Sequence, residues 1–93
     1  MVLILSLKDL GLLQKLNQKQ FPDKTDCYEF LMLEIQKHLV EINDLKENRD
    51  PHTIKEIIDL SILTRMLALT EGADKDMFKE RFGKFQKNIK ASI

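Results

Sequence analysis

Apolar residues recur at every third or fourth position along most of this chain, which is the spacing of one face of an α-helix. The pattern predicts a first helix over about residues 7–19, capped by Ser6, and then a loop over residues 21–25. A second helix is predicted over about residues 26–46, with Asp26 as its capping residue. The alternating pattern typical of strands is missing, so the sequence predicts an all-α protein.

Glycine and proline fall where further helices are expected to begin and end. Asp50 followed by Pro51 predicts the start of a third helix, which Gly72 ends after about residue 70. Asp74 predicts the start of a fourth helix, which reaches about residue 90. Because the connection around residues 48–50 is short, the second and third helices are expected to be antiparallel neighbours. We therefore expect a single domain over residues 1–93, folded as a four-helix antiparallel bundle.

The third helix is apolar almost all round, unlike the other three. One side carries Ile54, Ile58, Ile62 and Leu69, and the other carries Ile57, Leu60, Leu63 and Leu67. Such a helix is either central or part of an interface. A monomer of 93 residues can hardly cover it on every side. A homodimer or homotetramer built around this helix is therefore expected. The fourth helix carries a single apolar stripe, formed by Phe78, Phe82, Phe85 and Ile89.

Composition narrows the class of protein. The chain has 15 basic and 15 acidic side chains, and this balance argues against a dedicated nucleic-acid or membrane binder. The single cysteine, Cys27, excludes an internal disulfide and is expected to pack in the core of a cytoplasmic protein. The apolar run over residues 1–5 is too short for a signal peptide or membrane span, so it is expected at a core edge or subunit contact.

Candidate chemistry centres on Glu56 and Asp59, which share one face of the third helix within an apolar segment. A partly buried pair of carboxylates needs a partner, and a divalent cation is a natural one. Glu34, His38 and Glu41 likewise share a face of the second helix. Antiparallel packing is expected to bring Glu41 near Glu56 and Asp59, and converging carboxylates in a helical bundle can hold Mg²⁺ or Mn²⁺.

A simpler alternative stays open at this point. Lys37, Lys46 and Lys55 are close enough in sequence to pair with these acids on a solvated surface. His38 can equally be a core histidine rather than a ligand. Spacing alone does not choose between a cation site and an ordinary charged surface.

Four stretches of sequence point to a known family. They are LLQKL at residues 12–16, FPD at 21–23, LVEIND at 39–44, and DPH at 50–52 followed by IKEIID at 54–59. With Lys84 and Asn88 in the last helix, they make the chain resemble the MazG-like all-α nucleotide pyrophosphohydrolases. Members of that family carry Glu-Glu-x-x-Glu on one helix and Glu-x-x-Asp on the next, bind Mg²⁺ there, and split nucleoside triphosphates into monophosphate and pyrophosphate.

The resemblance implies a function and a set of site residues. It implies a four-helix bundle of the MazG-like type that hydrolyses nucleoside triphosphates with Mg²⁺ or Mn²⁺. Glu41 and Glu56 would be catalytic residues, and the metal ligands would be Glu41, Glu56 and Asp59, with His38 and Glu34 as auxiliaries. Phosphate contacts would come from Lys84 and Asn88.

The first acidic motif departs from the family pattern. In the preferred alignment Lys37 and His38 replace the two leading glutamates, and only Glu41 remains. In a second alignment Glu34 is the first glutamate, while Ile35 and His38 replace the other two. A histidine at this position suits a softer cation such as Mn²⁺. Three alternatives follow: an enzyme with weakened activity, a catalytically inactive relative that acts as a helical oligomeric binding or interaction protein, or an unrelated helical adaptor.

Overall fold

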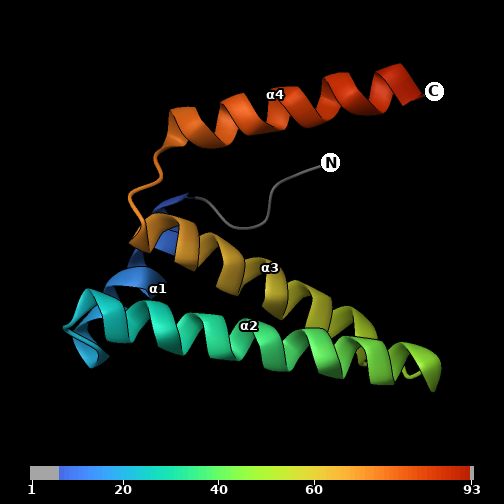
Figure 1. Ribbon diagram of the computed structural model, residues 1–93, viewed down its shortest axis with the longest axis horizontal. Coiled ribbons are helices and arrows are strands. Elements are labelled where there is room, and N and C mark those ends of the chain that lie inside the picture. The colour runs from blue at the N-terminus through green and yellow to red at the C-terminus, as the bar shows by residue number, and fades with distance from the viewer. Residues whose placement is uncertain (1–6, 93) are drawn as a thin grey trace.

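The computed structural model describes residues 7–92 of the chain. It contains four α-helices: α1 (Leu7–Gln20), α2 (Lys24–Glu47), α3 (Thr53–Thr70) and α4 (Lys75–Ser92). No strand occurs within residues 7–92, so the all-α prediction is confirmed there (Figure 1). The predicted cap at Ser6 and the predicted contact over residues 1–5 lie outside the described part of the chain.

Helix α2 begins two residues earlier than predicted. Its N-cap is Asp23, whose side chain accepts hydrogen bonds from the backbone N–H groups of Thr25 at 2.8 Å and Asp26 at 3.3 Å. Asp26 therefore lies in the first turn of the helix, where a carboxylate interacts favourably with the helix dipole, and is not the cap.

Helix α3 begins later than predicted, at Thr53. The side chain of Asp50 accepts a hydrogen bond of 2.9 Å from the backbone N–H of His52, which forms a turn before the helix. The backbone N–H and hydroxyl of Thr53 both donate to the Asp50 carbonyl, at 3.1 and 2.6 Å. Pro51 is therefore a turn residue and not the first residue of the helix.

Helices α2 and α3 are each followed by a residue with positive φ. Gly72 follows α3 with a φ of 96°, as the sequence predicts for a helix stop, and the N–H of Ala73 donates to Ala68 at 2.9 Å. Arg49 takes the same left-handed position after α2, with a φ of 54°. The next N–H, that of Asp50, donates to the carbonyl of Leu45 at 2.9 Å.

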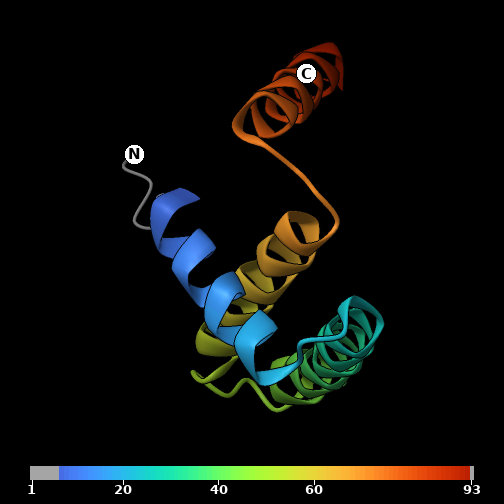
Figure 2. The same ribbon diagram turned by 90° about the vertical axis from the view of Figure 1, so that its left-hand side faces the viewer.

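Three helices pack together. Helices α2 and α3 form the predicted antiparallel pair, and α1 lies across α3 and contacts α2 (Figure 2). The aromatic rings of Phe21 and Phe30 stack beside this core, with their centres 4.6 Å apart. Cys27 is fully buried, as predicted, and its sulfur accepts a hydrogen bond from the Asn17 side chain at 2.9 Å. The buried apolar residues are Leu10, Cys27, Leu31 and Met66.

Helix α4 lies apart from the other three helices in both views (Figures 1 and 2). Helix packing within the described residues involves α1, α2 and α3, and the side chains of Phe82, Phe85 and Ile89 stay 64%, 60% and 59% exposed. The radius of gyration is 15.1 Å, against about 12 Å for a compact domain of this length. The four predicted helices are present, but in a single chain only three of them form a packed unit.

None of the four helices described is both long enough and apolar enough to cross a bilayer.

Candidate metal centre

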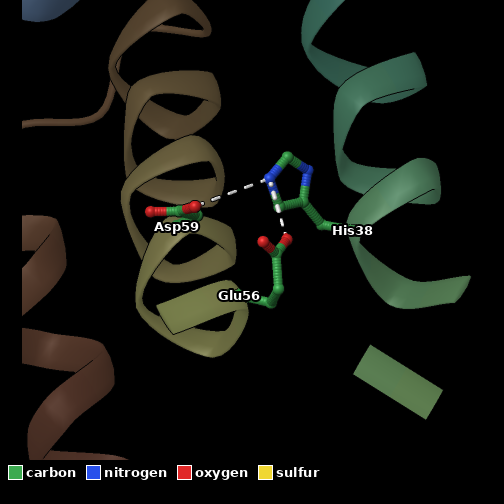
Figure 3. A group of neighbouring side chains, drawn as sticks. All are labelled: His38, Glu56 and Asp59. Atoms are coloured by element: carbon green, nitrogen blue, oxygen red, sulfur yellow. Dashed lines mark ion pairs between the residues drawn. The ribbon is translucent and has the colours of Figure 1, made fainter. Parts of the chain in front are cut away.

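Three potential metal ligands from two helices converge on one point. His38 projects from α2 towards Glu56 and Asp59 on α3 (Figure 3). Its Nε2 atom lies 3.4 Å from Glu56 Oε2 and 3.9 Å from Asp59 Oδ2. One ligand atom from each residue lies within 4.8 Å of the others. The face that Glu56 and Asp59 share on α3 therefore meets the His38 face of α2, because the two helices are antiparallel neighbours.

The imidazole ring of His38 is anchored on its other side. Its Nδ1 atom lies 2.7 Å from the backbone carbonyl oxygen of Glu34, so the Nδ1 proton is donated there. This hydrogen bond raises the pKa of His38, the charges of Glu56, Glu41 and Asp59 raise it further, and burial opposes the rise. A protonated ring would pair with both carboxylates, whereas a neutral ring presents the lone pair of Nε2 to a cation.

Glu56 is the least satisfied member of the cluster. Its Oε2 atom is inaccessible to solvent and has no hydrogen-bond partner within residues 7–92. A side-chain hydrogen bond with Glu41 is the main cause that raises the pKa of Glu56, and burial and the Glu41 charge add to it. The His38 charge lowers this pKa, and the Asp59 charge raises it. Glu41 is therefore near enough to Glu56 to affect it, but the residue of α2 that lies between Glu56 and Asp59 is His38 and not Glu41.

A shallow hollow of about 280 Å³ adjoins the cluster. Its polar lining comes from Glu34, His38 and Asp59, and its apolar lining comes from Phe30, Ile62 and Leu63. No motif in the sequence singles out the apolar wall of this hollow. The spacing nevertheless indicates it, because Phe30 lies one helical turn before Glu34 and Leu63 lies one turn after Asp59, so each apolar residue is next to an acid on the helix surface.

The alternative of lysine pairing is not what the structure shows. Within residues 7–92, Lys37, Lys46 and Lys55 form no ion pair with the acids of the cluster. His38 is the basic group that pairs with Glu56 and Asp59 there. The cluster consequently holds more negative charge than its own side chains neutralise.

Two of the predicted site residues lie elsewhere. Lys84 and Asn88 belong to α4, which does not pack on the α2–α3 pair in a single chain. The Nζ atom of Lys84 lies 3.9 Å from Glu80 Oε1, one turn earlier in the same helix. The structure therefore gathers His38, Glu41, Glu56 and Asp59, with Glu34 at the edge, and leaves both predicted phosphate contacts outside.

Compared with protein-family models, with curated proteins and with solved structures, the chain matches none. The likeness to the MazG-like family therefore rests on the sequence stretches quoted above, and the candidate chemistry rests on the geometry of the cluster.

Proposed function

We propose that this protein is a MazG-like nucleoside triphosphate pyrophosphohydrolase, which uses a divalent cation to produce monophosphate and pyrophosphate. The observation that carries the proposal is the convergence of His38, Glu56 and Asp59 from two antiparallel helices. The resemblance supplies the reaction, and the geometry supplies a place for the cation.

The residues present fit a divalent cation. A buried carboxylate oxygen without a hydrogen-bond donor, such as Glu56 Oε2, is costly, and a cation would satisfy it. One imidazole nitrogen with two carboxylate oxygens suits Mn²⁺ better than Mg²⁺, which prefers oxygen ligands throughout. A bound cation would polarise the phosphate chain as a Lewis acid.

Each side chain then has a distinct role. Glu56 and Asp59 supply negative charge, and His38 supplies a nitrogen whose direction is fixed by its bond to the Glu34 carbonyl. Glu41 is exposed and close enough to Glu56 to raise its pKa, so in this proposal it would take a proton from an attacking water. The position of His38 between the two carboxylates favours the alignment in which it replaces the third glutamate of the family motif.

The proposal includes an oligomer. In a single chain Lys84 and Asn88 lie away from the cluster, so a contact between them and phosphate needs another copy of the chain. Exposed isoleucines on α3, at positions 54 and 58, offer an apolar contact for a homodimer or homotetramer. A closed four-helix antiparallel bundle would form in that assembly.

The direct test is pyrophosphate release from each of the common nucleoside triphosphates, with Mn²⁺, with Mg²⁺ and with a chelator. Release is expected only with a cation, and Asp59→Asn should lower kcat/KM by about two orders of magnitude, because a charge that acts on the transition state is lost. Asp44→Asn is the matched control, since Asp44 is an exposed aspartate of α2 outside the cluster. Wild-type protein that releases no pyrophosphate with either cation would rule the enzyme out.

A second candidate is a catalytically inactive relative that acts as a helical oligomeric binding or interaction protein. The exposed aromatic stripe of α4 favours it, because monomeric proteins rarely leave such a face uncovered. Calorimetric titration with Mn²⁺ and Mg²⁺, with and without a non-hydrolysable nucleotide, separates the two candidates. Cation or nucleotide binding without turnover identifies the inactive relative, and an absence of binding identifies an interaction protein.

A further inference from the structure

Helix α4 follows α3 after a short connection, and within residues 7–92 each end of this connection is hydrogen-bonded only to its own helix. At the end of α3, the Gly72 N–H donates to Leu69 at 3.1 Å, and the Ala73 N–H donates to Ala68 at 2.9 Å. At the start of α4, the Asp74 side chain accepts a 2.9 Å hydrogen bond from the Met77 N–H. In a single chain α4 points away from the α2–α3 pair, and its apolar stripe stays exposed (Figures 1 and 2).

Helix α4 also differs from α2 in charge. It carries six basic and two acidic side chains, whereas α2 carries six acidic and three basic ones. Lys79 and Arg81 flank the apolar stripe of α4 on either side, as their spacing from Phe82 shows. Lys84 lies on the opposite side of the helix. The complementary partner for an apolar stripe with basic edges is an apolar surface with acidic edges, because the opposite charges at the edges attract.

The hollow between α2 and α3 has that composition. Phe30, Ile62 and Leu63 form its apolar lining, and Glu34 and Asp59 form an acidic edge. Two exposed residues extend the apolar surface along the helices. Leu33 lies three residues beyond Phe30, and Ile58 lies four residues before Ile62. The side chains of Leu33 and Ile58 are each 53% exposed.

We infer that α4 is an exchanged arm, which lies in the α2–α3 hollow of a second copy of this chain. Phe82 and Phe85 contact the apolar lining, and Lys79 and Arg81 reach the acids at the edge. The second copy makes the same contact in return, so the pair is a closed two-fold dimer. In each copy the arm of the partner completes a four-helix bundle around the cluster.

This inference deepens the oligomer in the proposed function by naming the helix that is exchanged and the surface that receives it. It does not depend on catalysis. In this dimer Lys79 and Arg81 face the receiving surface and Lys84 faces away from it, so the phosphate contact proposed for Lys84 would require a further copy, as in a homotetramer.

The test measures molar mass by light scattering at micromolar concentration, without metal or nucleotide. Wild-type protein is expected at twice the 10.9 kDa chain mass, and Phe82→Glu with Phe85→Glu is expected at the monomer mass. Met77→Glu is the matched control, since Met77 is exposed on another side of α4 and should leave the dimer intact. On the receiving surface, Ile58→Glu should also give monomers, while its exposed neighbour changed as Ile57→Glu should not.

Mixing the two monomeric variants makes the test specific to exchange. The double phenylalanine variant keeps an intact hollow, and Ile58→Glu keeps an intact arm, so a mixed pair has one intact contact and should recover part of the dimer. An α4–α4 or α3–α3 contact uses the same surface on both copies and gives no recovery. Monomeric wild-type protein, a dimer that survives Phe82→Glu with Phe85→Glu, or mixing without recovery would each overturn the inference. Because catalysis is not measured, none of these results bears on pyrophosphate release.

Discussion

His38 is held at both ring nitrogens, and this decides what can occupy the space between α2 and α3. The Glu34 carbonyl takes the Nδ1 proton, and Nε2 faces Glu56 and Asp59. Either a proton on Nε2 or a cation beside it relieves the charge of the two carboxylates. The two occupants exclude each other, because a metal-bound imidazole must be neutral at that nitrogen.

The first prediction concerns the pH dependence of stability without metal. The pKa of His38 is raised above 6.5. Its contribution to stability is therefore complete below that value and is lost as pH rises through the folded-state pKa. The pKa of Glu56 is raised above 4.5, so its ionisation also lowers stability as pH rises. Thermal melts followed by circular dichroism should show the melting temperature falling from mildly acidic to mildly alkaline pH, with a shallower fall in His38→Gln.

Added Mn²⁺ provides the control for this prediction. Cation binding needs a neutral imidazole and ionised carboxylates, so the rise in melting temperature caused by Mn²⁺ should grow with pH. If the melting temperature of wild-type protein depends on pH as that of His38→Gln does, with and without Mn²⁺, then His38 neither pairs with the carboxylates nor binds the cation.

At the residue scale, the sequence predicted that α2 and α3 bring potential ligands together, but it expected Glu41 in the position that His38 takes between Glu56 and Asp59. The face shared by Glu56 and Asp59 follows from helical spacing, and its meeting with α2 follows from the short connection. His38 and Glu41 are three residues apart and so differ by about 60° around α2. Which of them lies between the carboxylates depends on how α2 is rotated against α3. The packing of Leu31 against Met66 sets that rotation, and no local motif encodes it.

At the scale of the helix, the number and order of elements were predictable, but two of the starting points were not. Asp23 and Asp26 are both competent capping residues, and the path of the chain after Pro22 decides between them. Asp50 was predicted to cap α3, yet it forms a turn that precedes the helix. The stop at Gly72 was predicted correctly because a left-handed residue strongly favours glycine.

The two left-handed helix ends yield a paired prediction. Arg49 holds a φ of 54°, which costs a non-glycine residue about 1 kcal/mol, so Arg49→Gly should stabilise the protein by about that amount. Gly72→Ala should destabilise it by a similar amount through backbone strain, since an added Cβ would meet no atom within 4 Å. Each change should move the melting temperature by about 4–8 °C.

The neighbouring residue Asn48 serves as the control, because its φ of −86° gives glycine no conformational advantage. Asn48→Gly should therefore fail to stabilise the protein. Equal stabilisation by Asn48→Gly and Arg49→Gly would show that the left-handed conformation of Arg49 is not the cause.

At the scale of the whole molecule, the sequence predicted four helices but not the separate position of α4. The spacing of Phe78, Phe82, Phe85 and Ile89 shows which face of the helix needs to be covered. It does not show whether the cover comes from the same chain or from another. That depends on the path of the connection between α3 and α4, which the spacing of these residues does not specify.

Hydrogen exchange gives a prediction at this scale. An unpacked helix of 18 residues is only marginally stable in water, because most helical stability in proteins comes from tertiary packing. In monomeric Phe82→Glu with Phe85→Glu, the amides of α4 should therefore exchange with little protection, while those of α2 and α3 stay protected. In wild-type protein α4 should be protected as well. Protection of α4 in the monomeric variant that equals that of α2 would contradict the prediction.

The burial of Cys27 has a practical consequence. Its thiol is the only one in the chain and lies wholly inside the packed unit of α1, α2 and α3. A reagent that modifies thiols can reach it only when that unit opens. Under native conditions the rate of modification therefore reports how often the protein opens spontaneously, and no engineered cysteine is needed.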